Sequence, residues 1–149
     1  MAINMIKKGK VFSIIFLLVL IDQLTKFIFR DVDLIGNIIY LKSYRNTGSA
    51  FSLFSGLEYY NWFIIILSLI IFIICLYKYK NLVSNKYYLF SFIFFISGII
   101  CNFLDRFFLG YVRDFIGIKY FSIFNIADIY LSLAVIILIY YEIKNNQKI

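Results

Sequence analysis

Long apolar runs dominate the pattern of hydrophobic and polar positions along this chain. Four of them approach the length of a membrane-spanning helix: 11–29, 59–77, 87–104 and 123–141. A helix needs about 20 predominantly apolar residues to cross the roughly 30 Å of hydrocarbon in a bilayer. The pattern therefore predicts a membrane protein of the all-α class, with four transmembrane helices in a single integral membrane domain over residues 1–149.

A small β element is expected between the first two runs, in residues 30–58. Residues 34–41 and 50–54 are rich in Ile, Leu, Tyr and Phe, which is typical of short strands. Gly36-Asn37 and the Asn-Thr-Gly sequence at 46–48 supply turn residues. We expect these strands to lie on the membrane surface.

The composition restricts the chemistry that the chain can perform. Of its 149 residues, 63% are hydrophobic and 15% are charged, and there is no histidine. This absence excludes a Ser-His-Asp or Cys-His nucleophile and an HExxH zinc site within the chain. Cys75 and Cys101 both lie inside apolar runs, so we expect packing residues, with no disulfide, metal or cofactor.

The distribution of charge predicts the orientation in the membrane. The N-terminal tail, the 78–86 connection and the C-terminal tail together hold eight bases and one acid, whereas the rest of the chain holds seven of each. Basic residues concentrate on the cytoplasmic side of membrane proteins. Both termini should therefore be cytoplasmic, and segments 30–58 and 105–122 should face outward. Because topology accounts for the lysines, we expect no nucleic-acid partner.

Polar residues gather toward the outer ends of three runs, and each one inside a membrane is a functional candidate. They are Asp22, Gln23, Lys26, Asn102, Asp105, Arg106, Asn125 and Asp128. Asp22 and Lys26 are four residues apart, so they share a helix face and can pair. Asp105 and Arg106 are interpreted as an interfacial ion pair.

Asp128 requires a partner, because the 13 residues that follow it to Tyr141 are too few to cross a bilayer. The last span should therefore begin near Ile123, which places Asp128 about 7–8 Å along the helix. Asp114, in the second outer loop between apolar flanks, can supply that partner. Two adjacent carboxylates share a proton and can act as general acid and base, as in aspartic proteases.

Three other interpretations remain open at this point. A Ser-Lys signal peptidase would use Lys26 with Ser49 as the best outer serine. A proton or cation pathway would use Asp22, Lys26 and Asp128, although the inner halves of the runs hold few polar residues. A purely structural membrane subunit would leave the ordered polar motifs unexplained.

Five motifs in order along the chain resemble those of the bacterial lipoprotein signal peptidases, also called signal peptidase II. They are Asp22-Gln23-Leu24-Thr25-Lys26, the NTGSAF sequence at 46–51, the GIICNFLDR sequence at 98–106, Val112-Arg113-Asp114-Phe115 and the FNIAD sequence at 124–128. One departure is visible, because Ser97 and Cys101 stand where the family usually has glycines.

The resemblance implies roles for particular residues. The two catalytic aspartates of this membrane aspartic endopeptidase family fall on Asp114 and Asp128. Substrate-positioning residues are expected at Asn46, Gly48, Asn102, Arg106 and Asn125. Structural polar residues are expected at Asp22, Lys26 and Asp105.

The resemblance also implies a fold, a substrate and a location. The family fold adds an extracytoplasmic β-cradle, much of it expected from residues 34–54, and a short surface helix over the site. Family members cut prolipoproteins before a diacylglyceryl-modified cysteine and are inhibited by the cyclic peptide globomycin. We accordingly expect a monomer among membrane lipids in the bacterial cytoplasmic (inner) membrane, with its active site at the extracytoplasmic face.

Overall fold

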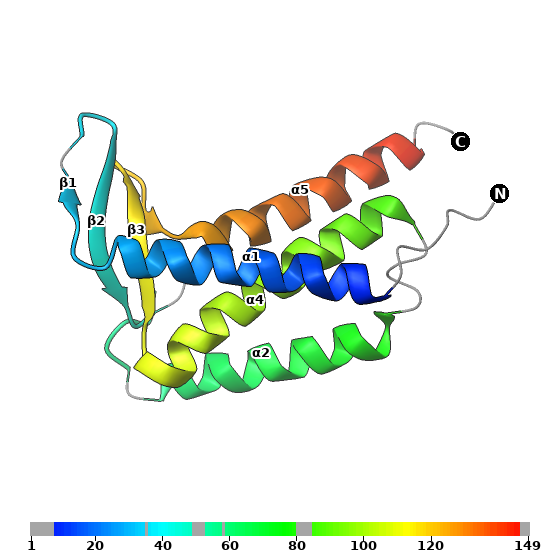
Figure 1. The fold of residues 1–149 in the computed structure, drawn as a ribbon, viewed down its shortest axis with the longest axis horizontal. Coiled ribbons are helices and arrows are strands. Elements are labelled where there is room, and N and C mark those ends of the chain that lie inside the picture. Colours follow the sequence, from blue (N-terminus) through cyan, green and yellow to red (C-terminus); the bar gives the residue numbers. More distant parts are fainter. Residues whose placement is uncertain (1–7, 35, 49–52, 58, 80–84, 147–149) are drawn as a thin grey trace.

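Four long helices and a small sheet make up the computed structural model, which describes residues 8–34, 36–48, 53–57, 59–79 and 85–146. The helices are α1 (Lys8–Ile28), α2 (Tyr60–Tyr77), α4 (Lys86–Leu109) and α5 (Ile126–Asn146). All four are long and apolar enough to cross a membrane, which confirms the four predicted spans. The sheet lies at one end of the bundle, and the start of α1 and the end of α5 lie at the other (Figure 1).

The boundaries of two spans differ from the prediction. The expectation that the last span begins near Ile123 is wrong, because residues 123 and 124 form a strand and the helix begins at Ile126. Asp128 is therefore in the first turn of α5. The third helix continues to Leu109, past the predicted end of the span at residue 104, so Asp105 and Arg106 lie within the helix.

Local sequence explains where α4 starts and stops. The side chain of Asn85 accepts a hydrogen bond of 2.8 Å from the backbone N–H of Tyr87, which satisfies a donor in the first turn. Gly110 ends the helix at φ +81°, a left-handed conformation that glycine adopts without a steric penalty.

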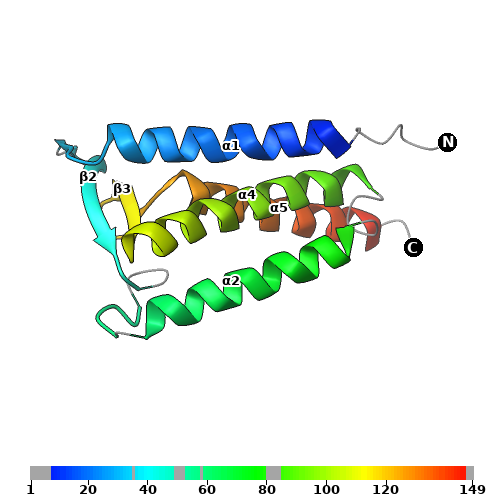
Figure 2. The same ribbon diagram turned by 60° about the horizontal axis from the view of Figure 1, so that its bottom comes forward.

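The helix α4 contacts the other three helices, and Figure 2 shows it between α1 and α2. It lies close to α5 at Gly98, where an added Cβ would lie 2.7 Å from Leu131 Cγ and 2.8 Å from the carbonyl oxygen of Ala127. In contrast, Ile65 is the buried residue of α2. Most of the other apolar residues of α2 are exposed in the protein alone, as expected for a helix that faces lipid.

Four antiparallel strands form the sheet in the order β1-β2-β3-β4. They are β1 (Asp33–Leu34), β2 (Ile39–Asn46), β3 (Val112–Ile118) and β4 (Ile123–Phe124). The turn predicted at Gly36-Asn37 lies between β1 and β2, as expected. The predicted turn at Asn46 is confirmed as well, because its Oδ1 accepts a 2.9 Å hydrogen bond from the N–H of Gly48.

The sheet differs from the predicted cradle in where its strands come from. β3 belongs to the second outer segment, and β4 to the start of the run predicted as the last span. Val112 and Phe115 of β3 bury their side chains, and this strand pairs with β2. The strand expected at 50–54 falls mostly on residues 50–52, outside the described residues, and 53–54 form a turn. The expected short surface helix has no counterpart among the described helices, and residues 49–52 and 58 lie outside them.

Candidate active site

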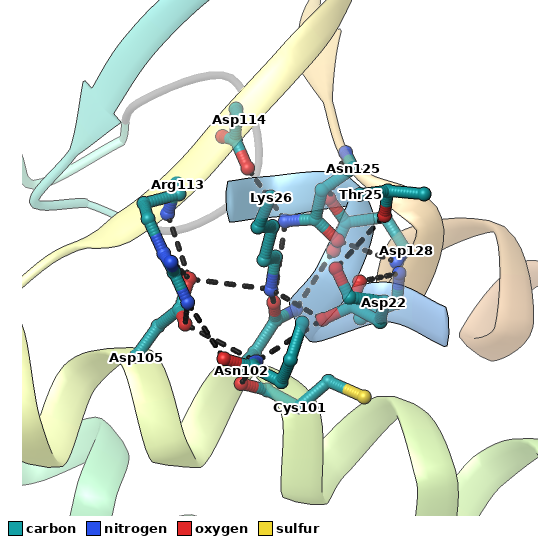
Figure 3. Close-up of polar contacts among 12 residues, drawn as sticks. Asp22, Thr25, Lys26, Cys101, Asn102, Asp105, Arg113, Asp114, Asn125 and Asp128 are labelled. Atoms are coloured by element: carbon teal, nitrogen blue, oxygen red, sulfur yellow. Dashed lines mark hydrogen bonds and ion pairs between the residues drawn. The ribbon is translucent and has the colours of Figure 1, made fainter. Parts of the chain in front are cut away.

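Asp114 lies on β3, where it pairs with Tyr44 of β2 in the sheet register. The interpretation of this segment as a loop is therefore wrong, and the sheet ladder is what holds the residue in place. Its carboxylate points from the strand toward the polar residues of the helices (Figure 3). It accepts hydrogen bonds from Asn46 Nδ2 at 3.0 Å and from Asn125 Nδ2 at 2.6 Å, and the residue is 2% exposed.

Asp128 is held by the start of α5. The backbone N–H of Asn125 donates to Asp128 Oδ2, and the backbone N–H of Asp128 donates to Asn125 Oδ1, both at 3.1 Å. This reciprocal pair is a capping box, with asparagine as the cap and aspartate three residues later. The local sequence at 125–128 thus orients the carboxylate as it begins the helix.

Two asparagine side chains connect the two aspartates. Asn102 on α4 donates from Nδ2 to Asp128 Oδ1 at 2.9 Å. Asn125 donates from Nδ2 to Asp114 and, at 3.2 Å, to Asn102 Oδ1. All four carboxylate oxygens of Asp114 and Asp128 therefore accept an N–H donor, which satisfies one buried and one half-buried group that would otherwise be costly.

Both aspartates line one cavity of about 730 Å³ between α2, α4, α5 and the sheet. Its other polar lining includes Asn46, Asn102 and Arg106. Most of the remaining wall is apolar, and along α5 it continues from Asp128 to Ile136. That stretch corresponds to about 12 Å of helix, so the cavity joins a polar end at the carboxylates to a long apolar slot.

The environment of Asp114 favours its protonated form. Burial, followed by the nearby carboxylate of Asp128, raises the pKa of Asp114 from its ordinary 3.8 to about 7. Hydrogen bonds from Asn46 and Asn125 oppose this shift. A carboxyl group that titrates near neutrality beside a second carboxylate can donate or accept a proton, which suits general acid–base chemistry.

A buried ion network lies behind this site and has Lys26 at its centre (Figure 3). Its ammonium is 2.9 Å from Asp22 and 3.3 Å from Asp105, and it donates to Asn102 Oδ1 at 3.1 Å. Arg113 adds a second cation 2.6 Å from Asp105. The two carboxylates and the two cations balance in charge. An unbalanced charge would be costly to remove from solvent.

The network reaches α5 through its backbone. Asp22 Oδ1 accepts a 2.8 Å hydrogen bond from the N–H of Ala127, directly beside Asp128. Gln23 donates to Asp105 at 3.3 Å and accepts from Arg113 at 2.6 Å. These contacts connect α1, α4 and β3, so the network holds three segments in register around the cavity.

Arg106 connects the cavity to the first outer segment. Its guanidinium donates to the carbonyl oxygen of Gly48 and, at 3.4 Å, to Asn61 Oδ1. Asn61 returns a 3.2 Å hydrogen bond to the carbonyl oxygen of Arg106. Gly48 in turn donates to Asn46, the partner of Asp114.

The expected Asp22–Lys26 pair is confirmed, whereas the interpretation of Asp105 and Arg106 as a pair is wrong. Consecutive helical residues point about 100° apart, and these two face different partners. Gly48 and Asn125 are not among the residues that line the cavity, although both bond to residues that do.

Two residues of the site were not singled out as functional in the sequence: Asn61 and Arg113. Arg113 lies inside one of the five motifs, next to Asp114. Asn61 is a polar residue at the start of an otherwise apolar span. Its place at that end was the signal that could have identified it as part of the site. Cys75 and Cys101 are both free thiols, and Cys101 is fully buried.

Comparison with known proteins points to one family. A family model described as "Signal peptidase (SPase) II" matches residues 14–144. A lipoprotein signal peptidase of Caldicellulosiruptor bescii is 36% identical over 132 residues, covering 85% of each chain. One from Listeria monocytogenes is 33% identical over 140 residues, covering 86% of this chain and 89% of the relative.

Solved structures agree with the sequence comparison. A bacterial membrane enzyme determined by the in meso method at 2.3 Å superimposes with a TM-score of 0.84 at 30% identity, covering 95% of this chain and 92% of the other. A second such enzyme, determined at 1.9 Å, gives a TM-score of 0.79 at 31% identity, covering 93% and 95%. The four helices and the small sheet are thus the architecture of these membrane enzymes.

Proposed function

This chain belongs to the signal peptidase II family and is a multi-pass membrane peptidase, and we propose that it is an aspartic endopeptidase acting on diacylglyceryl-modified prolipoproteins. It removes the signal peptide by cutting before the lipidated cysteine. One observation carries the proposal: Asp114 and Asp128 line the same cavity and share Asn125 as a hydrogen-bond partner. They are the proposed catalytic pair.

The two carboxyl groups can complete hydrolysis without any further group. One carboxylate takes a proton from water as the water oxygen bonds to the scissile carbonyl carbon, and the other carboxyl gives its proton to the carbonyl oxygen. The tetrahedral intermediate then collapses. The carbon–nitrogen bond breaks, the amine nitrogen receives the first proton, and the second carboxyl recovers its own.

The charge around the cavity supports a singly protonated pair. Asp22 and Asp105 are balanced by Lys26 and Arg113. Arg106 is the remaining cation beside Asp114 and Asp128 among the described residues. The whole buried group is neutral when the two aspartates hold one proton between them, and a neutral group is the least costly to bury.

Arg106 is a better hydrogen-bond donor to the developing oxyanion than Asn125 is. The two amide hydrogens of Asn125 are already directed to Asp114 and Asn102. Arg106 carries five N–H donors, of which its contacts with Gly48 and Asn61 use two within the described chain. Its charge stabilises negative charge on the carbonyl oxygen in a site largely shielded from water.

The shape of the cavity fits a substrate that is itself in the membrane. The apolar slot along α5 accommodates apolar chain or lipid, while the scissile bond lies at the carboxylates. The excess of lysines in the two tails and in the 78–86 connection supports a cytoplasmic location for the end of the bundle opposite the sheet. The cavity then opens toward the extracytoplasmic face of the bacterial inner membrane, where globomycin would compete with the substrate.

Two alternatives are less well supported. A Ser-Lys mechanism needs a lysine that is available as a base, whereas Lys26 is engaged with Asp22, Asp105 and Asn102. An ion pathway needs polar groups through the full membrane depth. In the described helices the buried charged residues are confined to the end that carries the sheet.

Cleavage of a purified diacylglyceryl prolipoprotein, with and without globomycin, tests the proposal. Asp114→Asn and Asp128→Asn should each lower kcat on the order of 10³-fold or more while the protein stays folded. Asp31→Asn is the matched control, because Asp31 is an exposed aspartate paired with Arg30. Substantial cleavage by either of the first two variants would overturn the assignment of the pair.

A further inference from the structure

The hydrogen-bond donors to Asp114 and to Asp128 differ in the groups that they themselves contact. Asp114 accepts from two neutral side-chain amides, those of Asn46 and Asn125. Asp128 accepts from the backbone N–H of Asn125 and from the amide of Asn102. Asn102 is itself bonded to an ammonium, that of Lys26.

Lys26 determines which way the Asn102 amide points. An ammonium can only donate, so the oxygen of the amide must face Lys26, and Nζ lies 3.1 Å from Oδ1. The amide nitrogen is then directed at Asp128, 2.9 Å away. The reversed amide would place N–H against the ammonium and oxygen against the carboxylate, which is unfavourable at both ends.

Lys26 is itself rigidly placed. Its side chain is fully buried and held by Asp22 on its own helix and by Asp105 on α4. Asp22 also accepts from the N–H of Ala127, so α1 and the first turn of α5 are joined at this point. A charge fixed in this way can act on Asp128 through one intervening amide.

The first turn of α5 acts in the same direction. Asp128 is the third residue of the helix and is bonded to the cap residue Asn125. Helix N-termini favour negative charge because their N–H groups point outward from the helix. Asp114 lies in a strand and has no such terminus.

We propose that Lys26, acting through the side-chain amide of Asn102, makes the two aspartates unequal: Asp128 is held ionised and Asp114 carries the shared proton. Asp128 then accepts the proton from water, and Asp114 protonates the carbonyl oxygen. Lys26 is thus a positioning residue that does not touch the substrate. The inference rests on the proposed function and assigns separate roles within its pair.

The charged groups facing the pair from each element are consistent with this assignment. Helix α1 contributes Lys26, which attracts the negative charge of Asp128, and Asp22, which repels it with a smaller effect. Helix α4 contributes Arg106. Asp105 and Arg113 are one ion pair further away and balance each other. Among the cations of the described residues, Lys26 is the one whose hydrogen bond reaches Asp128 through Asn102.

The proton assignment is tested by carboxyl-carbon NMR of ¹³C-labelled aspartate in detergent-solubilised protein. In Asp128→Asn the remaining Asp114 should keep its proton to a higher pH than the remaining Asp128 does in Asp114→Asn. The reverse order, or equal titration, would overturn the assignment. Cleavage by the same variants separates the hypotheses, because activity in either one contradicts the proposed function, whereas reversed titration in inactive variants contradicts this inference alone.

The role of Lys26 is tested with the double variant Lys26→Met/Asp22→Asn, which removes the pair without leaving an uncompensated charge. We expect a roughly tenfold lower kcat, a KM within about twofold, and an acid limb of the pH–rate profile raised by about one unit. If Lys26 only neutralised the charge of Asp22, the double variant would keep the wild-type kcat and the wild-type acid limb. This result would overturn the inference.

A second background keeps the test decisive if the double variant folds poorly. Asn102→Leu leaves Lys26 its contacts with Asp22 and Asp105 but removes the connecting amide. In an Asn102→Leu background, Lys26→Arg should change kcat less than it does in the wild type, because the path to Asp128 is already broken. Equal effects in both backgrounds would show that Lys26 acts independently of Asn102.

Discussion

Asn125 and Asp128 hold each other in both directions at the first turn of α5, through two hydrogen bonds of 3.1 Å. The same bonds that begin the helix therefore orient the carboxylate. They also direct the amide nitrogen of Asn125 away from Asp128, toward Asp114 and Asn102. Helix initiation and the geometry of the proposed catalytic pair are thus parts of one local structure.

The titration of Asp114 should be visible in stability as well as in activity. Its pKa in the folded protein, about 7, lies above its ordinary value of 3.8, so folding favours the protonated carboxyl. This contribution to stability is fully present below about pH 4 and is lost as pH rises toward 7. The melting temperature measured by thermal denaturation should therefore fall more from pH 5 to pH 8 in the wild type than in Asp114→Asn.

The same titration predicts the pH dependence of cleavage. Activity should fall on the alkaline side as the pair loses its shared proton near pH 7, giving a bell-shaped profile whose two apparent pKa values belong to the pair. The exposed-residue variant Asp31→Asn should reproduce the wild-type profile. An activity that is constant from pH 6 to pH 9 would contradict the prediction.

The close approach of α4 and α5 at Gly98 should be sensitive to a single methyl group. In Gly98→Ala the new Cβ meets the backbone oxygen of Ala127 at 2.8 Å, so the helices must separate. We expect a loss of about 1–3 kcal/mol in the free energy of unfolding. Cleavage should also fall, since the Asn102–Asp128 hydrogen bond joins the same two helices.

Gly9→Ala provides the matched control for this substitution. An added Cβ at Gly9 would have no neighbour within 4 Å among the described residues, although the position is also helical. The melting temperature of Gly9→Ala should equal or slightly exceed that of the wild type, because alanine has a higher helix propensity than glycine. A Gly98→Ala protein as stable and active as Gly9→Ala would show that the helices separate without cost.

Asn61 should affect catalysis although it lies on α2, outside the predicted site. It bonds to Arg106 in both directions, and Arg106 holds the turn at Gly48 beside the Asp114 partner Asn46. Asn61→Ala should lower kcat severalfold, corresponding to about 1 kcal/mol for a lost hydrogen bond. The exposed Asn145→Ala, at the far end of α5, should leave kinetics unchanged.

Arg106→Lys tests the same connection from its other end. Lysine keeps the charge but lacks the planar guanidinium that reaches Gly48 and Asn61 together. We expect a larger loss than in Asn61→Ala, with kcat reduced about tenfold or more. Single-turnover cleavage of the lipidated substrate measures it, and wild-type kcat in Arg106→Lys would contradict the role given to this residue.

Ser49→Ala separates the aspartate mechanism from a Ser-Lys mechanism. Ser49 lies outside the described residues, so the prediction rests on Lys26, whose ammonium is engaged by two carboxylates. Cleavage by Ser49→Ala should remain within about threefold of wild type, since no covalent step passes through a serine. Loss of activity comparable to that of Asp114→Asn would favour the serine nucleophile.

Much of the site could be predicted because its residues lie in short local motifs. The pairing of Asp22 with Lys26 follows from helical spacing within one segment. The turn at Asn46 follows equally from its own sequence. In contrast, the pairing of Asp105 was predicted incorrectly, because its partners Lys26 and Arg113 come from α1 and β3. Asn61 was missed for the same reason, since its partner is on α4.

The sequence by itself determined the four spans and, for three of them, the end that carries polar residues, because span length and hydropathy are properties of a continuous segment. Only the tertiary structure decided which polar groups meet. Asp114 and Asp128 reach one cavity because β3 pairs with β2 and because α4 and α5 approach closely at Gly98. Strand register and helix packing depend on contacts between distant segments, which no local pattern records.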